Sequence, residues 1–270
     1  MQDSQENVNN VSIVSNAESK ENVTLICFAL DKSGSMGSTS GLWQAAISGT
    51  NEFVQSQDPS INTTLPPSKT LFGMVLFDTV ATWKTPTGVF NVDVPPQPQE
   101  DTEPPYVFTD IKEFVPLTEE QYKPYGMTAL YDAVFKLISG VDLYIVDHPE
   151  YNINVIVVIQ TDGAENSSRR TSAERLRNTI TECSAAGWKF TFLGADQDAC
   201  LAAARIGIDR TASVCYSNDA THTRQVMFTM ANAVSRHRSL PTHEQSMSQV
   251  AYTEGERQEL TQALVTGTDL

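Results

Sequence analysis

Short, continuous runs of apolar residues alternate along this chain with longer segments in which apolar residues recur every three or four positions. Continuous apolar runs are typical of strands that are buried on both faces of a parallel sheet. The runs therefore predict four buried strands, at residues 23–30, 71–77, 155–159 and 188–194.

The segments between and after these strands carry helical spacing. The apolar positions form one stripe on each predicted helix, which leaves a polar opposite face. Gly187 is expected to end the helix before the strand at 188–194, because glycine is common just beyond a helix end. The predicted helices cover residues 42–54, 128–145, 172–186, 199–206 and 220–238, with a further strand at 212–216. Repeated strand–helix units favour an α/β fold: a doubly wound, mostly parallel central sheet with helices on both faces.

Three segments fall outside this alternation. Residues 1–22 are polar and are expected to form a flexible arm, and residues 240–270 are expected to form a polar, acidic tail with at most one marginal helix. Residues 86–124 hold eight of the thirteen prolines and several acidic residues, which predicts a long excursion from the core with one possible strand at 107–115. The remainder, residues 23–239, is expected to form one domain.

Composition narrows the functional classes. The chain has 18 basic against 33 acidic side chains, a net charge of −15, so it is expected to repel nucleic acid. It lacks an apolar run of about 20 residues and a secretory signal pattern, which predicts no membrane partner and a cytoplasmic location. The four cysteines are widely spaced and are expected to be buried free thiols, and the four histidines are expected at the surface.

Oxygen-bearing side chains follow the predicted strands. Loops at the carboxyl ends of parallel strands converge at one edge of the sheet, where ligands bind. Carboxylates and hydroxyls without nitrogen or sulfur suit Mg²⁺ or Mn²⁺, and Ca²⁺ less so. Such a set leaves a coordination position of the cation open. The predicted metal ligands are Asp31, Ser33, Ser35, Thr128 and Asp162.

These motifs resemble a von Willebrand factor A-type (vWA) domain with a complete metal-ion-dependent adhesion site (MIDAS). They are Asp31-x-Ser33-x-Ser35, Thr128 in the stretch GMTALYDA and Asp162 in the stretch TDG, in this order over about residues 23–216. The resemblance implies that Ser33 and Ser35 bind the metal directly and that Asp31 binds it directly or through water. It implies that Thr128 and Asp162 alternate between direct and water-mediated contact. The stretch FLGADQDA at 192–199 is most similar to bacterial and bacteriophage intracellular members.

Each residue also has a purely structural interpretation. Serines stabilise turns, and Thr128 suits a helix N-cap, which typically contributes about 1 kcal/mol. Asp132 is expected to face the amides of the first turn of its own helix. The candidate rim of the site comprises Gly34, Gly163, Glu165 and Asp196.

Three functions follow from the sequence. The first is a non-enzymatic binding module, in which the cation accepts an Asp or Glu carboxylate from a protein partner. The second is a Mg²⁺- or Mn²⁺-dependent hydrolase or phosphotransferase, for which no general base, nucleophile or phosphate-binding loop is evident. The third is an adaptor or regulatory subunit of a larger assembly that includes an ATPase, an analogy drawn from related domains. The sequence does not indicate an oligomeric state.

Overall fold

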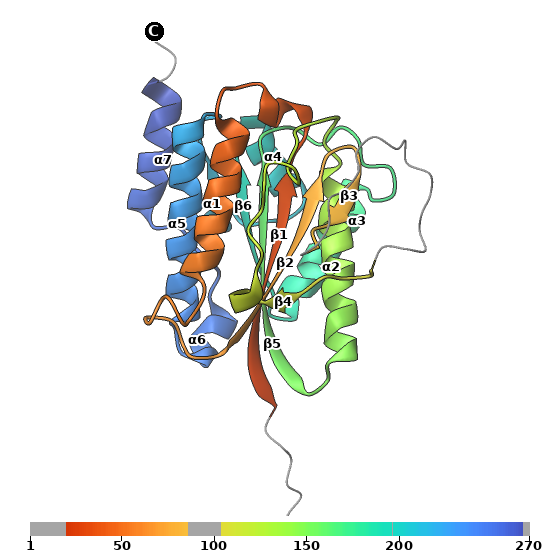
Figure 1. Ribbon diagram of the computed structural model, residues 1–270, viewed down its shortest axis with the longest axis vertical. Coiled ribbons are helices and arrows are strands. Elements are labelled where there is room, and N and C mark those ends of the chain that lie inside the picture. Colours follow the sequence, from red (N-terminus) through yellow and green to blue (C-terminus); the bar gives the residue numbers. More distant parts are fainter. Residues whose placement is uncertain (1–19, 86–103, 196, 267–270) are drawn as a thin grey trace, which may run out of the picture.

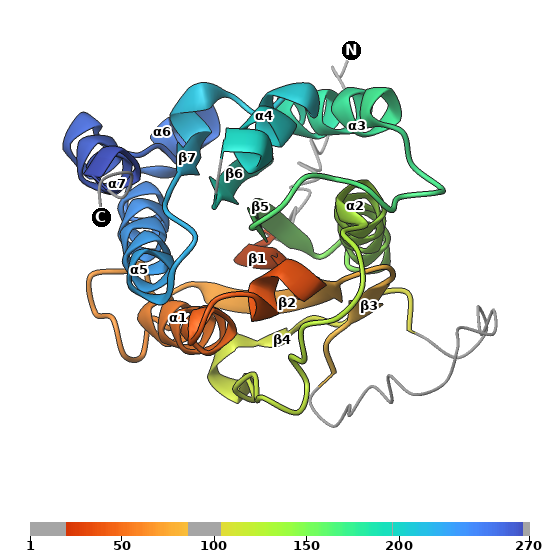
Figure 2. The ribbon, with the colours of Figure 1, turned by 90° about the horizontal axis from the view of Figure 1, so that it is seen from above.

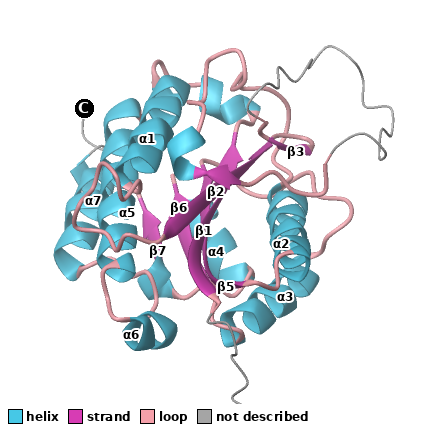
Figure 3. Ribbon diagram, turned by 60° about the horizontal axis from the view of Figure 1, so that its bottom comes forward, coloured by secondary structure: helices cyan, strands magenta, loops and turns pink. Residues whose placement is uncertain are grey.

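The central element is one seven-stranded sheet. The computed structural model describes residues 20–85, 104–195 and 197–266. Along the sheet the strand order is β3-β2-β1-β5-β6-β7, and β4 pairs with β2 outside this path. The pairs β1–β2, β1–β5, β5–β6 and β6–β7 are parallel, whereas β3 and β4 run antiparallel to β2 (Figures 1 and 3). The strands are β1 (Glu21–Asp31), β2 (Lys69–Phe77), β3 (Ala81–Trp83), β4 (Thr109–Asp110), β5 (Tyr151–Thr161), β6 (Lys189–Gly194) and β7 (Ser213–Cys215).

Helices cover both faces of this sheet (Figure 2). One face packs against α1 (Leu42–Ser56), α5 (Ala220–Arg238) and α7 (Glu254–Thr266), and the other against α2 (Leu130–Asp147), α3 (Ala173–Ala185) and α4 (Gln197–Arg205). Alternate residues of β1 enter the two cores, since Cys27 and Ala29 belong to one and Phe28 and Leu30 to the other. The predicted fold class, a mostly parallel α/β sheet between two helical layers, is confirmed. Gly187 follows α3 with a φ of +100°, as a glycine at a helix end does.

The predicted polar tail at 240–270 differs from the structure. It holds two helices, α6 (Thr242–Met247) and α7, and an extended segment between them. Val250, Tyr252 and Leu260 are buried in the core, and the Tyr252 hydroxyl lies 2.9 Å from Thr191 Oγ1 of β6. The described part of this segment, residues 240–266, is therefore a structural part of the domain.

The second half of the proline-rich excursion also returns to the core. Within the expected strand at 107–115, only Thr109 and Asp110 belong to a strand, and the short 3₁₀ helix η2 (Ile111–Glu113) follows them. The Phe108 ring packs edge-on against Trp83, with centroids 5.3 Å apart, and Tyr122 is fully buried. Residues 86–103 and the first nineteen residues of the predicted arm lie outside the described part.

Two side-chain expectations need correction. Cys27 and Cys183 are free and buried as expected, but Cys215 is disulfide-bonded. His237, expected at the surface, is buried at the end of α5. Among the described helices, none has the length and hydropathy needed to cross a bilayer.

A buried arginine joins three elements at the amino edge of the sheet. Arg238 is only 2% exposed. Its guanidinium donates to Gln57 O (2.7 Å) and Oε1 (3.1 Å) beyond α1, and to Thr70 Oγ1 (2.6 Å) on β2. These bonds satisfy polar groups that burial would otherwise leave unpartnered.

Candidate metal centre

The predicted ligands come from three loops at the carboxyl edge of the sheet, the upper edge in Figure 1. Asp31 is the last residue of β1, and Ser33 and Ser35 follow in the loop that contains the 3₁₀ helix η1 (Gly34–Gly37). Asp162 follows β5 directly, and Thr128 lies two residues before α2. Because β1 and β5 are parallel neighbours, their following loops are adjacent.

The Asp31 carboxylate holds its own loop and the neighbouring strand. Oδ1 accepts a hydrogen bond from the Ser33 amide at 2.7 Å, and Oδ2 accepts one from Thr161 Oγ1 at 2.6 Å. The Asp31 carbonyl accepts a hydrogen bond from the buried Tyr122 hydroxyl. The carboxylate is thus fixed from both sides, and each of its oxygens keeps further acceptor capacity.

A chain of short contacts connects the serines with the second carboxylate. Ser33 Oγ lies 3.0 Å from Ser35 Oγ, and Ser35 Oγ donates to Asp162 Oδ1 at 2.7 Å. A methyl group built on Gly163 would lie 3.7 Å from both Ser35 Oγ and Thr128 Oγ1. The hydroxyls of Ser35 and Thr128 therefore border the same point, and the structure brings oxygen atoms from all three motifs together.

Backbone contacts fix the loop that carries Thr128. The Gly34 amide donates to Gly126 O at 3.0 Å, which joins this loop to the serine loop. The Thr128 amide donates to Asn166 Oδ1 at 2.8 Å, and Thr128 O accepts from the Asn166 and Ser167 amides at 3.1 and 3.2 Å. Thr128 precedes α2 as part of this network, and no side-chain bond caps the helix at Ala129.

The carboxylates of Asp31 and Asp162 lie close together in a buried site. Their mutual repulsion costs electrostatic free energy, which a bound cation would offset. Burial and the nearby charge of Asp162 raise the pKa of Asp31 to about 7. The adjacent Lys32 ammonium pairs with Asp78. Two carboxylates and three hydroxyls are hard oxygen donors, so the residues fit Mg²⁺ or Mn²⁺. In the described ranges, no three His, Cys, Asp or Glu side chains gather into a different metal site.

Two acidic residues near the centre support loops instead. Glu165, predicted on the rim, accepts hydrogen bonds from the amides of Tyr131, Ser167 and Ser168 (2.7–2.9 Å) and from the Ser168 hydroxyl (2.7 Å). Its carboxylate thus joins the start of α2 to the loop after β5.

Asp132, which follows Tyr131 in α2, has a comparable role. It was expected to face its own helix, but it accepts from the amides of Arg169, Arg170 and Thr171 at 2.8–3.3 Å. Of the other predicted rim residues, Gly34 and Gly163 lie at the centre, and Asp196 lies outside the described residues.

Three residues around the centre were not identified in the sequence. Thr161 and Tyr122 bond to Asp31, as described above, and Asn218 Nδ2 lies 3.4 Å from Asp162 Oδ2. Thr161 directly precedes Asp162, so its position at the strand end was available as a signal. Asn218 is far from the motifs along the chain, and only the fold brings it close. Tyr122 lies just before the stretch that contains Thr128, but no motif marks its contact with Asp31.

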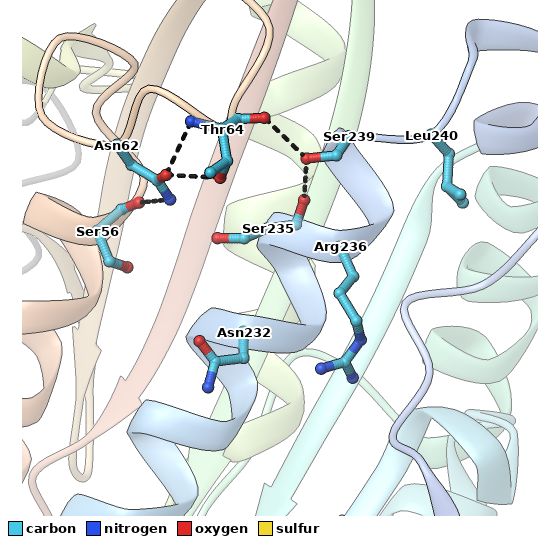
Figure 4. A pocket seen from close by; sticks show the side chains of 8 residues that line it. All are labelled: Ser56, Asn62, Thr64, Asn232, Ser235, Arg236, Ser239 and Leu240. Carbon is cyan, nitrogen blue, oxygen red and sulfur yellow. Dashed lines mark hydrogen bonds between the residues drawn. The ribbon is translucent and has the colours of Figure 1, made fainter.

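A polar cavity lies at the opposite edge of the sheet, and Figure 4 shows the side chains that line it. It measures about 650 Å³ and lies between the end of α1, the following loop and the last turns of α5. Its polar side chains bond mostly to their neighbours: Asn62 donates to Ser56 O, and Ser239 donates to Thr64 O. The volume of this cavity therefore does not by itself make it the functional site. The set of oxygen donors favours the metal centre as the candidate functional site.

Comparisons with solved structures identify the fold. The vWF domain of the type V pili tip protein Mfa5 from Porphyromonas gingivalis is 10% identical, with a TM-score of 0.50, over 80% of this chain and 96% of that one. Another similar structure is proximal thread matrix protein 1 from the mussel byssus with a zinc-occupied MIDAS motif, which is 14% identical with a TM-score of 0.49. This chain spans 46% of that protein. No family model and no curated protein matches the sequence. The sheet topology and the similarity to the Mfa5 vWF domain together show the Rossmann-like fold of vWA domains.

Proposed function

We propose that this chain is a protein-binding module that captures a carboxylate of its partner through a bound divalent cation. Asp31, Ser33, Ser35, Thr128 and Asp162 would hold the cation, with Mg²⁺ or Mn²⁺ as the preferred ion. The observation that carries the proposal is the continuous contact from Ser33 through Ser35 to Asp162, with Asp31 and Thr128 at the same edge.

The charge of the donor set supports this function. The carboxylates of Asp31 and Asp162 together carry no more negative charge than the cation carries positive charge. The occupied site would therefore have no excess negative charge to repel a further carboxylate. Ser35 is exposed, whereas Asp31, Ser33, Thr128 and Asp162 are buried. The protein would thus hold the cation on the buried side of the site, and an Asp or Glu side chain of a partner could complete the coordination from the solvent side.

A binding role is favoured over catalysis. The carboxylates of Glu165 and Asp132, which hold the loops of the centre, accept several hydrogen bonds each, mainly from backbone amides, so they are poorly placed to take a proton from water. A role as an adaptor in a larger assembly is compatible with the same chemistry. The cytoplasmic location and the bacterial or bacteriophage affinity remain predictions from the sequence. The disulfide bond of Cys215 contradicts the expectation that all four cysteines are reduced thiols.

Peptide binding tests the proposal. A fluorescent peptide with one central Glu should bind in Mg²⁺ and dissociate in chelator, and the matched Gln peptide should not bind. Ser33→Ala should abolish the Mg²⁺-dependent binding. Ser40→Ala is the matched control, because Ser40 is exposed in the same loop outside the motif. Equal binding of the Glu and Gln peptides, or binding unchanged by Ser33→Ala, would refute the proposal.

A phosphatase assay separates the enzymatic alternative. Hydrolysis of a generic phosphate ester that requires Mg²⁺ and disappears in Asp162→Ala would replace the binding function with catalysis. The proposal predicts no such turnover.

A further inference from the structure

Three large apolar side chains are exposed next to the candidate metal centre. Tyr125 and Met127 flank Gly126, in the loop before Thr128, and are 69% and 46% exposed. Val80, in the turn between β2 and β3, is 46% exposed. We call these three residues the apolar lip.

The apolar lip is attached directly to the loops of the centre. The Tyr125 amide donates to Lys32 O at 3.0 Å, between Asp31 and Ser33. The Met127 amide donates to Thr79 Oγ1 at 3.0 Å, which joins this loop to the turn that carries Val80. Thr128, a candidate ligand, is the next residue. A partner that reaches the cation therefore meets these side chains at the same edge.

The backbone of the lip is rigidly defined. Gly126 has a φ of +73°, and its carbonyl accepts the Gly34 amide. In the second turn, the Asp78 amide donates to Val80 O and the Val80 amide donates to Asp78 Oδ1, both at 3.0 Å. Loops whose backbone is already fixed lose little backbone entropy on binding, which favours recognition.

Other exposed apolar residues differ in their surroundings. Val146 lies in the last turn of α2, at the opposite edge of the sheet, and Phe228 lies within α5. Single exposed apolar residues are normal on protein surfaces. The lip is distinct because its members lie on two hydrogen-bonded loops, one of which also carries the candidate ligand Thr128.

We propose that the apolar lip selects a partner whose metal-binding Asp or Glu is flanked by large apolar side chains. This inference rests on the proposed function, and it adds the class of ligand sequence. The carboxylate would satisfy the cation, and the flanking side chain would cover Tyr125, Met127 and Val80. An interface with a buried polar contact beside an apolar anchor is typical of protein recognition.

Two fluorescent peptides test the inference by anisotropy in Mg²⁺ and in chelator. One carries a central Glu between Leu and Phe, and the other carries the same Glu between two serines. The wild type should bind the apolar-flanked peptide about tenfold more tightly. The double variant Tyr125→Ser/Met127→Ser should bind both peptides equally and should keep its Mg²⁺ affinity. Each single variant should lose part of the preference, which covers the case of a misfolded double variant.

Val146→Ser is the matched control, because it removes a comparably exposed apolar side chain from the opposite edge, and it should keep the full preference. Mg²⁺-dependent binding of both peptides with equal affinity would overturn the proposal for the apolar lip and leave the proposed function intact. A preference that survives in the double variant would also overturn it. Absence of Mg²⁺-dependent binding for both peptides would instead refute the proposed function, and the lip with it.

Discussion

Replacement of Gly126 by alanine tests how the loop geometry supports the metal centre. Gly126 has a φ of +73°, a conformation that costs an L-residue roughly 1–2 kcal/mol. A methyl group at this position would also meet Thr79 Oγ1 at 2.4 Å. Relief of this clash requires Thr79 to turn away, which breaks its hydrogen bond from the Met127 amide and costs about 1 kcal/mol. Gly126→Ala should therefore lower the free energy of unfolding by roughly 2–3 kcal/mol.

Gly187→Ala provides the matched comparison. Gly187 has a φ of +100°, but a methyl group there would have no neighbour within 4 Å. This variant should lose only the conformational cost, roughly 1–2 kcal/mol, without the further loss expected from the clash with Thr79. Urea unfolding followed by circular dichroism measures both variants. Calorimetry should show weaker Mg²⁺ binding for Gly126→Ala, because Thr128 is two residues away, and unchanged binding for Gly187→Ala.

Equal destabilisation by the two substitutions would show that the clash with Thr79 is absent and would refute this part of the reasoning. Unchanged Mg²⁺ affinity in Gly126→Ala would show that the geometry of the loop before Thr128 does not affect metal binding at the centre.

Three further predictions concern stability and the supporting residues. Arg238→Met should destabilise the fold by roughly 1–3 kcal/mol in urea unfolding, because it leaves buried acceptors of Gln57 and Thr70 without a donor. An unchanged free energy of unfolding would contradict this. Asp132→Ala should destabilise by roughly 1–3 kcal/mol but leave Mg²⁺ affinity unchanged in calorimetry, since its carboxylate holds backbone amides; a large loss of affinity would make it part of the centre. Burial and the charge of Lys189 lower the pKa of His237 to about 4, so the unfolded state binds the proton first, and stability should fall as the pH drops from about 6.5 to about 4. His237→Gln should flatten that part of a pH series of unfolding experiments, and an unchanged slope would refute the assignment.

The positions of the core strands and the grouping of the motifs were largely accessible from the sequence. The core strands β1, β2, β5 and β6 are buried on both faces, so their apolar runs are continuous and easily recognised. Because Asp31 ends a strand, Asp162 follows one and Thr128 lies just before a helix, the topology alone places them at one edge.

The parts that escaped prediction depend on contacts between distant residues. Val250, Tyr252 and Leu260 are isolated apolar residues in a polar sequence, and no periodic stripe announces their burial. The orientation of Glu165 and Asp132 was equally hidden, because every residue except proline has a backbone amide that can donate to a carboxylate, so these contacts leave no residue-type signature. Asn218 lies 56 positions after Asp162, and no motif spacing connects them.

Calorimetric titration of the chelator-treated protein with Mg²⁺ tests the central claim most directly. The account predicts saturable binding at one site, its loss in Ser33→Ala and its retention in Ser40→Ala, with all three folds checked by circular dichroism. Absence of binding in the wild type, both alone and with the Glu peptide present, would contradict the claim. Undiminished binding in Ser33→Ala would place the cation elsewhere and would contradict it equally.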